Sequence, residues 1–221
     1  MLPVEVNIIE VGPRDGLQNI SEFIDTERKV ELINSLSETG LRRIEVTSFV
    51  HPKAMPQMRD AAAVISSIKK YQGVRYSVLV PNAVGAGLAL DAGALELNAV
   101  ISASESHNWS NTKRTIAQSL NEFEEINKLC MVQGKIWLRA IIATAFGCPF
   151  EGRINIYRVK EIALKLIQSG AREIVLADTT GMGNPVLVQK VIEELICVIG
   201  VTELTVHFHN NRGNGIVNIF A

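Results

Sequence analysis

Seven short runs rich in β-branched residues alternate with longer stretches of helical period, and this alternation constrains the fold more than any other feature. The runs begin near Glu5, Arg42, Arg75, Leu95, Lys135, Arg172 and Glu203. They follow one another about every 33 residues, a spacing that leaves room for one helix between successive strands. The order strand, helix, strand therefore predicts seven parallel strands joined by right-handed crossovers.

Helix boundaries are marked clearly in the second half of the chain. Asn184 and Pro185 are typical of an N-cap and a first helical position. Gly170 stands where a C-cap glycine belongs, and Gly40 ends an earlier helix in the same way. The helix before Gly170 is predicted from apolar residues at helical spacing, namely Val159, Ile162, Ala163, Leu166 and Ile167.

Two folds produce such an alternation, a closed (β/α)8 TIM barrel and an open doubly wound sheet. An open sheet normally carries a glycine-rich binding motif in its first turn. The first turn here reads GPRDG over residues 12–16, with neither GxGxxG nor a Walker loop. We therefore expect a single TIM-barrel domain over residues 1–221. Eight units would need about 264 residues, so we expect the barrel to lack its last β/α unit and to be incomplete at its C-terminus.

Composition excludes several classes of function. The chain has 22 Lys and Arg against 23 Asp and Glu, a net charge of −1 that argues against nucleic-acid binding. It has neither an apolar run long enough to span a membrane nor a signal-peptide pattern at its start. Its three cysteines, Cys130, Cys148 and Cys197, are far apart and form no CxxC pair. These features predict a globular cytoplasmic protein in a reducing compartment, with no membrane or nucleic-acid partner.

Polar residues gather where the predicted strands end. In a parallel barrel, catalytic side chains lie at the carboxyl ends of the strands. The residues expected there are Arg14 and Asp15 at the end of the first strand, Glu45, Thr47 and Ser48 in the second, Asp178, Thr179 and Thr180 at the end of the sixth, and His207 and His209 at the end of the seventh.

The two histidines suggest a metal site. Side chains alternate along a strand, so His207 and His209 are expected on one face, with Phe208 facing the helices. Asp15 could complete a set of two imidazoles and one carboxylate, which suits a hard or borderline divalent ion. An equally simple interpretation makes the histidines partly buried donors and the Arg14-Asp15 pair a local ion pair or loop cap.

Glu45 is a more specific signal than the histidines or the Arg14-Asp15 pair. A carboxylate between Ile44 and Val46 must either face water or find a partner. Arg14, expected at the adjacent strand, is the available cation.

Other reactive residue types are less informative. We expect His51 and His107 to lie in solvent-exposed loops, and Cys148 to be structural because no base is near it in the sequence. Lys135 lies at the amino end of a predicted strand, the wrong end for catalysis. A metal-free lysine aldolase is therefore disfavoured.

Five segments together resemble the 3-hydroxy-3-methylglutaryl-CoA lyase family. They read VGPRDGLQN (11–19), IEVTSFVHPKAMPQMRD (44–60), ATAFGCPFEG (143–152), LADTTGMGNP (176–185) and VHFHNNRG (206–213). The resemblance implies a TIM barrel that binds Mg²⁺ or Mn²⁺ and cleaves an acyl-CoA, 3-hydroxy-3-methylglutaryl-CoA, to acetyl-CoA and acetoacetate. Leucine degradation and ketone body formation are the pathways it implies.

Carried over by position, the resemblance also implies a role for individual residues. Asp15, His207 and His209 would bind the metal, with His207 alternatively moving a proton. Arg14 would stabilise the developing enolate, and Glu45 would orient Arg14. The substrate-binding residues implied are Arg14, Gln18, Ser48, Asp178 and Thr179.

The chain also departs from the family pattern. Asn210 stands where many members have Asp. The family continues with an eighth β/α unit, an Asn metal ligand and a glycine-rich loop bearing a catalytic cysteine. We therefore expect impaired turnover, and we keep two alternatives open. One is a non-catalytic fragment that associates with a second copy through an open barrel edge, and the other is a related 2-oxoacid synthase or aldolase.

Overall fold

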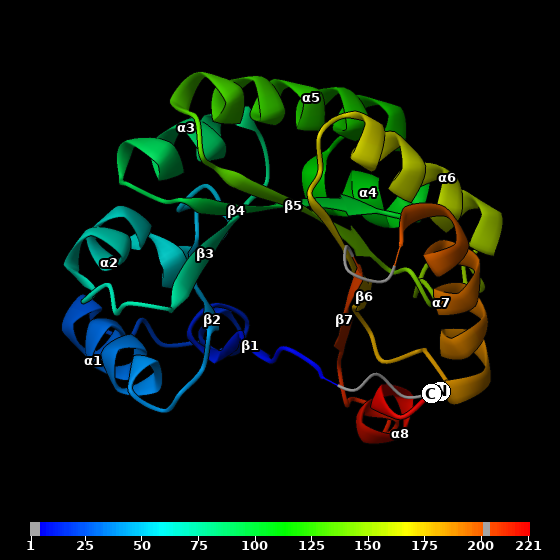
Figure 1. Cartoon of the computed structure of the whole chain (residues 1–221), viewed down its shortest axis with the longest axis horizontal. Coiled ribbons are helices and arrows are strands. Elements are labelled where there is room, and N and C mark those ends of the chain that lie inside the picture. Colours follow the sequence, from blue (N-terminus) through cyan, green and yellow to red (C-terminus); the bar gives the residue numbers. More distant parts are fainter. Residues whose placement is uncertain (1–4, 201–203) are drawn as a thin grey trace. The chain divides into compact units, whose positions relative to one another are not determined.

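The computed structural model describes residues 5–200 and 204–221, and within them seven strands form one sheet whose order follows the sequence from β1 to β7 (Figure 1). The strands are β1 (Ile9–Glu10), β2 (Arg43–Ser48), β3 (Arg75–Val80), β4 (Glu96–Ser102), β5 (Trp137–Ala143), β6 (Glu173–Asp178) and β7 (Leu204–Phe208). The pairs β1 with β2, β2 with β3, β5 with β6 and β6 with β7 are parallel. The predicted parallel topology is therefore confirmed.

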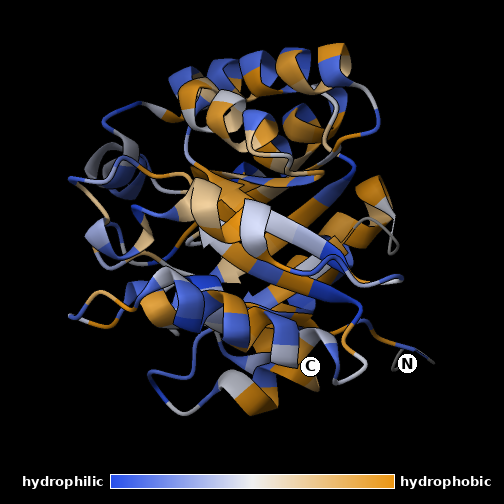
Figure 2. Ribbon diagram, turned by 90° about the vertical axis from the view of Figure 1, so that its left-hand side faces the viewer, coloured by the Kyte–Doolittle hydropathy of each residue, from blue (hydrophilic) through white to orange (hydrophobic). Residues whose placement is uncertain are grey.

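Helices alternate with these strands. They are the π-helical turn η1 (Gly12–Gly16), α1 (Thr26–Ser37), the 3-10 turn η2 (Pro56–Met58), α2 (Ala61–Ser67), α3 (Ala83–Asp91), α4 (Glu105–Thr112), α5 (Ile116–Gln133), α6 (Ile156–Gln168), α7 (Pro185–Ile199) and α8 (Gly215–Ile219). Figure 2 shows apolar and polar residues mixed along the helices, as expected of helices that bury one face. Within the described ranges, no helix combines the length and the apolar character needed to cross a membrane.

The chain divides into two compact units. The first contains the described residues up to Asn98 together with Leu129–Trp137, and the second contains Ala99–Lys128 and Leu138–Ala221. The division falls within β4 and β5.

In the first unit β2 is buried along its whole length, because helices cover the sheet. Ile44 and Val46 of β2 lie in the core with Ile33 of α1 and Val64 of α2. The register of β2 against β3 shifts between Glu45 and Thr47. Such a bulge turns the following side chains relative to the strand.

In the second unit the apolar stripe of α6 packs as the sequence predicts, with Val159, Ile162 and Leu166 buried. The Asn184 side chain caps α7 by accepting a hydrogen bond from Leu187 N at 3.1 Å, and Pro185 is the first helical residue. Gly170 follows the C-cap of α6 with φ +98°, a conformation that favours glycine. The predicted end of α6 and the predicted start of α7 are therefore confirmed.

The first strand differs from the prediction. A strand was expected from near Glu5, but β1 contains only Ile9 and Glu10. Val6 and Ile8 are 68% and 69% exposed, so the β-branched residues before β1 bury little surface that would stabilise an extended conformation.

Arg14 was expected at the end of the first strand, but it lies in the turn η1 after β1. Val11 has φ −119° and ψ 0°, a helical value of ψ, and Pro13 then favours the helical turn that carries Arg14 and Asp15.

Candidate functional site

Arg14 is held by Glu45 through a two-pronged ion pair. Its Nε donates to Glu45 Oε1 at 2.8 Å, and its second terminal nitrogen donates to Glu45 Oε2 at 3.3 Å. Both residues are buried, with Arg14 7% and Glu45 3% exposed. The predicted pairing of the β2 carboxylate with Arg14 is confirmed, and its forked geometry fixes the plane of the guanidinium.

Asp15 engages the remaining terminal nitrogen of the same guanidinium. Arg14 donates to Asp15 Oδ1 at 2.8 Å, and Gln18 Nε2 donates to the same oxygen at 3.0 Å. Burial lowers the pKa of Arg14, but the attraction of Glu45 and Asp15 outweighs it, so the pKa lies above its ordinary value. Arg14 therefore stays cationic, and Asp15 keeps one oxygen oriented by two donors.

The turn η1 presents this cluster. Gly12 N donates to Glu10 Oε1 at 2.6 Å, and a Cβ at Gly12 would lie 2.8 Å from that oxygen. A side chain at this position would therefore displace the Glu10 carboxylate from the Gly12 N–H. Asp15 N then donates to Val11 O at 2.6 Å, which closes the turn and fixes Asp15 beside Arg14.

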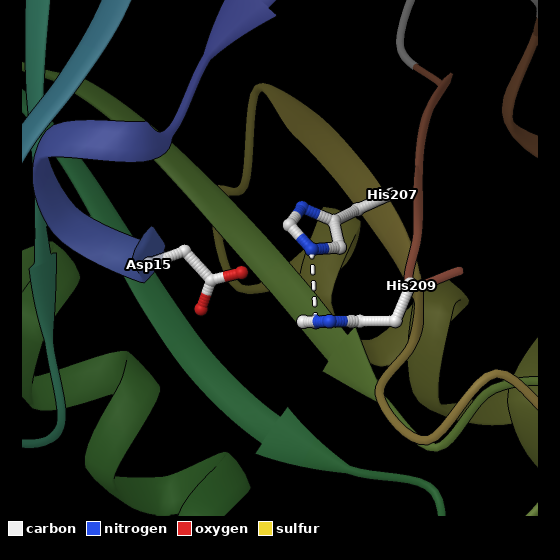
Figure 3. A group of neighbouring side chains, drawn as sticks. All are labelled: Asp15, His207 and His209. Atoms are coloured by element: carbon white, nitrogen blue, oxygen red, sulfur yellow. Dashed lines mark hydrogen bonds between the residues drawn. The ribbon is translucent and has the colours of Figure 1, made fainter. Parts of the chain in front are cut away.

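The two histidines at the carboxyl end of β7 lie together within the second unit. Their Nε2 atoms are 3.1 Å apart, and their ring centroids are separated by 4.8 Å at an angle of 51° (Figure 3). Phe208 between them in sequence stacks on Phe146, with ring centroids 5.6 Å apart. The prediction that His207 and His209 lie on one side is therefore confirmed, and two imidazole nitrogens face each other. Phe208 contacts the loop after β5, and its predicted contact with helices stays a prediction.

Asp178 ends β6 as expected, and its carboxylate shapes the turn that follows. Met182 N donates to Oδ1 at 2.8 Å and Gly183 N donates to Oδ2 at 3.0 Å. Burial raises the pKa of Asp178, opposed by the two N–H donors and by the charges of His209 and Arg212. The substrate-binding role expected of Asp178 stays a prediction, because both oxygens already accept backbone hydrogen bonds.

The other predicted substrate-binding residues have distinct surroundings. Ser48 is 1% exposed, and its hydroxyl has no hydrogen-bond partner among the described residues. A buried unpaired hydroxyl costs stability. Thr179 Oγ1 accepts a hydrogen bond from Thr144 N at 2.9 Å.

A cavity of about 520 Å³ in the second unit was missed by sequence reasoning. The loops after β5 and β6 and the first turns of α7 line it, contributing Phe146, Gly147, Gly152, Arg153, Met182, Asn184, Val186, Leu187 and Lys190. The sequence motifs GCPFEG (147–152) and GMGNP (181–185) lie in this region, but neither contains a pattern that predicts a cavity.

Of the residues expected to have other roles, His51 lies in an exposed loop, as predicted. His107 does not, because Ser104 caps α4 and places His107 in its first turn, partly buried. Cys148 is fully buried and donates to Ser104 Oγ at 3.0 Å, which agrees with a structural role. Lys135 is exposed and precedes β5.

Parallel α/β order with polar residues at the carboxyl ends of the strands defines the class of (β/α)-barrel enzymes. Comparison with known proteins narrows this class. The profile of the HMGL-like family matches residues 5–221. The chain belongs to that family.

Its relatives are hydroxymethylglutaryl-CoA lyases, which are carbon-carbon lyases. The chain is 42% identical to the Bacillus subtilis lyase YngG, covering 98% of this chain and 72% of the relative. It is 43% identical to the human cytoplasmic 3-hydroxy-3-methylglutaryl-CoA lyase and covers 59% of that protein. The resemblance inferred from the five segments is confirmed.

Solved structures agree. An Acinetobacter HMG-CoA lyase in complex with coenzyme A and 3-methylmalate superposes with a TM-score of 0.95 and 43% identity, covering all of this chain and 72% of that one. The carboxyl transferase domain of Rhizobium etli pyruvate carboxylase, at 14% identity and a TM-score of 0.70, shares the fold alone. The predicted TIM-barrel class is confirmed by the first of these likenesses.

Proposed function

We propose that this chain cleaves 3-hydroxy-3-methylglutaryl-CoA to acetyl-CoA and acetoacetate with the help of a divalent cation, and that its turnover is impaired. The observation that carries the proposal is the Arg14 guanidinium, which Glu45 and Asp15 fix in a buried position. Membership of a family whose characterised relatives are lyases of this substrate supports the same reaction.

The residues present fit a divalent metal. We propose Asp15, His207 and His209 as the metal ligands, as the family resemblance implies, and these three residues are a candidate ligand set by their chemistry. One carboxylate oxygen and two imidazole nitrogens suit a hard or borderline ion such as Mg²⁺ or Mn²⁺. Such an ion, when bound, supplies Lewis acidity toward a substrate hydroxyl or carbonyl oxygen.

Arg14 performs the complementary task. Breaking the carbon-carbon bond moves negative charge onto the thioester oxygen of the departing acyl group. A guanidinium that is already oriented stabilises this charge without having to reorganise as it develops. Glu45 holds Arg14 through Nε and one terminal nitrogen, and Arg14 cannot lose its proton at any working pH.

Asp15 and Gln18 complete this half of the site. Because Arg14 and Gln18 both donate to Asp15 Oδ1, the carboxylate is held in one orientation. The buried hydroxyl of Ser48 supports its proposed role in substrate binding, because a substrate oxygen could satisfy it. His207 and His209 contribute imidazole nitrogens rather than a base, because a ligated nitrogen cannot accept a proton.

The direct test is coupled detection of acetoacetate from 3-hydroxy-3-methylglutaryl-CoA with Mg²⁺, with Mn²⁺ and with EDTA, for the chain and its Arg14→Gln variant. We expect EDTA to abolish product formation and the substitution to slow it by about 10³-fold. Activity unchanged by both would overturn the site. Product formed only from a 2-oxoacid would assign the chain to a related synthase or aldolase.

Further details belong to the same proposal. We propose Mg²⁺ or Mn²⁺ as the ion, the cytoplasm as the compartment and association of two copies as the oligomeric mode. Metal analysis, fractionation and size-exclusion chromatography test them in turn. Roles in leucine degradation and ketone body formation follow only if the cleavage itself is observed.

A further inference from the structure

Thr144 holds an unusual backbone conformation at the carboxyl end of β5. Its φ is +56°, in the left-handed region that β-branched residues rarely adopt. Lys113 and Lys135 share this conformation among the described non-glycine residues, but both are exposed, whereas Thr144 is completely buried. A strained conformation persists only where surrounding contacts enforce it.

Hydroxyl groups from two neighbouring strands enforce it. Thr144 Oγ1 lies 2.7 Å from Ala143 O and 2.7 Å from Ser102 Oγ, and Ser102 Oγ lies 3.4 Å from the same carbonyl oxygen. The two hydroxyls and this carbonyl therefore form one hydrogen-bonded group. Thr144 N donates to Thr179 Oγ1 at 2.9 Å. The ends of β4, β5 and β6 are therefore joined through Thr144.

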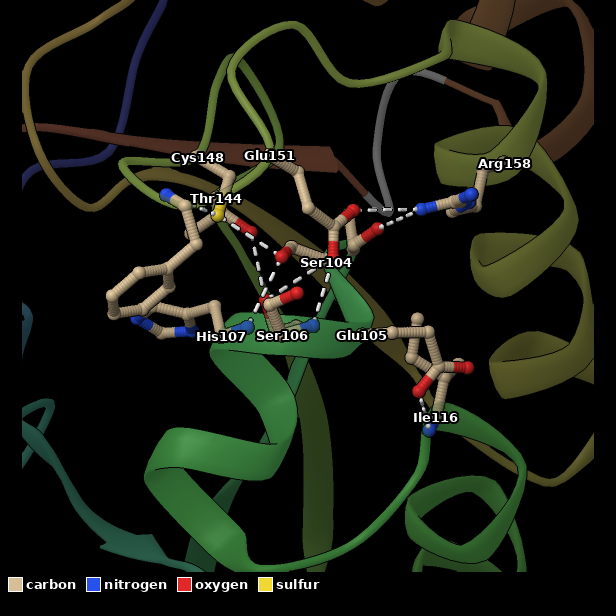
Figure 4. Close-up of polar contacts among 12 residues, drawn as sticks. Ser104, Glu105, Ser106, His107, Ile116, Thr144, Cys148, Glu151 and Arg158 are labelled. Carbon is tan, nitrogen blue, oxygen red and sulfur yellow. Dashed lines mark hydrogen bonds and ion pairs between the residues drawn. The ribbon is translucent and has the colours of Figure 1, made fainter.

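The chain of polar contacts continues away from the strand ends. Ser102 Oγ accepts from Ser104 N at 3.2 Å, and Ser104 Oγ accepts from Cys148 Sγ at 3.0 Å and from His107 N at 3.1 Å (Figure 4). Glu151 ties the same loop to α4 by accepting from Ser106 N at 2.7 Å. The segment after Thr144 is thus pinned at both ends.

Two loops start at the hydrogen bond between Thr144 and Thr179, and these loops line the 520 Å³ cavity. Gly147 of the first loop contacts Met182 of the second so closely that a Cβ on Gly147 would lie 2.8 Å from Met182 Cβ. The separation of the two loops is therefore fixed where they begin, by the bond between Thr144 and Thr179, and again at the contact between Gly147 and Met182.

We propose that Thr144 is a positioning residue whose strained backbone, held by Ser102 and Thr179, sets the separation of the two loops and with it the width of the cavity between them. The proposal deepens the proposed function, because Thr144 N donates to Thr179, which is among the residues expected to bind the substrate. It therefore assigns part of the substrate affinity of that reaction to Thr144, which acts through Thr179 and the loops. A merely structural role for Thr144 predicts instead that any loss of affinity follows loss of stability.

The test compares Thr144→Gly with Thr144→Ser. Glycine releases the strain and removes the hydroxyl, whereas serine keeps the hydroxyl. Lys135→Gly is the matched control, because it releases the same strain (φ 57°) at an exposed position before β5. Three quantities are measured for each variant: Tm, amide hydrogen exchange of peptides covering residues 145–155 and 179–184, and KM and kcat for 3-hydroxy-3-methylglutaryl-CoA with Mg²⁺.

For Thr144→Gly we expect a Tm within a few degrees of the parent, since released strain offsets the lost hydrogen bonds. Exchange in both peptides should rise about tenfold, and KM should rise roughly tenfold with kcat changed less. Thr144→Ser should keep the Tm, hydrogen exchange, KM and kcat of the parent chain. Lys135→Gly should change neither exchange in these peptides nor KM.

Parental exchange and KM in Thr144→Gly would overturn the proposal, as would losses that only accompany a collapse in Tm. If Thr144→Gly does not fold, Ser102→Ala replaces it, because it removes the hydroxyl that is hydrogen-bonded to Thr144 Oγ1 and leaves the sequence of both loops unchanged. If the parent chain cleaves no substrate, the proposed function fails, but hydrogen exchange still decides the role of Thr144.

Discussion

The Arg14 cluster of the first unit and the imidazole pair of the second differ in burial and in the hydrogen bonds that hold their side chains. Arg14 is buried and makes charged hydrogen bonds to two carboxylates. His207 and His209 are only partly buried, and the contact between their Nε2 atoms depends on one shared proton. The first arrangement fixes a charge before substrate arrives, and the second keeps nitrogen lone pairs that an ion can take by displacing that proton.

The comparison predicts that the largest effect comes from Arg14. Arg14→Gln should lower kcat for cleavage of 3-hydroxy-3-methylglutaryl-CoA by about 10³-fold, because the developing enolate loses its fixed positive charge. Steady-state kinetics at saturating Mg²⁺ measure this. Arg14→Lys keeps the charge but loses the fork toward Glu45, so it should recover only a small part of kcat. Full recovery by lysine would show that charge alone matters and that the pre-fixed geometry does not.

The imidazole pair should respond chiefly to metal. Mn²⁺ at about 100 times its Kd should raise the free energy of unfolding by about 2.7 kcal/mol, and Tm by about 5–10 °C. His207→Ala and His209→Ala should each abolish this increase while leaving the metal-free Tm nearly unchanged. Thermal melts with Mn²⁺ and with EDTA measure the difference. His51→Ala, in an exposed loop, is the control, and a metal response that survives both substitutions would remove the pair from the site.

Glu45 should matter more for stability than an exposed carboxylate in a similar ion pair. Glu45→Gln leaves a buried guanidinium with half of its compensation, so the free energy of unfolding should fall by about 2 kcal/mol. Glu31→Gln breaks the exposed pair with Arg28, whose N–O distance is 3.0 Å, and should cost less than about 0.5 kcal/mol. Urea titration compares the two. Equal losses would contradict the description of Arg14 as a fixed charge.

The residues at the strand ends could be predicted from the sequence because hydrophobic periodicity and helix-capping residues are local properties. Asn184 and Pro185 begin α7 as predicted, since capping and a fixed φ act within one turn. Glu45 was matched to Arg14 because a buried carboxylate in an apolar strand requires a cation. Alternation along β7 likewise predicted the placement of His207 and His209 on one side.

The failures depend on tertiary contacts that no local pattern encodes. β1 is short although Val6 and Ile8 favour strands, because strand propensity needs a surface to bury. The left-handed conformation of Thr144 arises from hydroxyls at the ends of two other strands, Ser102 and Thr179. A threonine between two alanines gives no sign of it.

His107 offers the smallest effect and the sharpest contrast with the imidazole pair, because it is a partly buried imidazole that stands alone. Burial lowers its pKa below 6.5, and its Nδ1 has no hydrogen-bond partner among the described residues. The folded state therefore resists protonation more than the unfolded state does. Stability contributed by His107 is present above pH 6.5 and is lost as pH falls through 6.5 toward the lower folded pKa.

His107→Gln should accordingly reduce the fall in Tm between pH 7 and pH 5 by about 1–2 °C. Melts at closely spaced pH values in EDTA measure this, with the parent chain beside the variant. The increase in Tm caused by Mn²⁺ at pH 7 should be the same in both, since His107 contributes nothing to the metal group. If His107→Gln instead weakened the response to Mn²⁺, binding would not be confined to the paired imidazoles, and the distinction between the pair and a lone buried ring would fail.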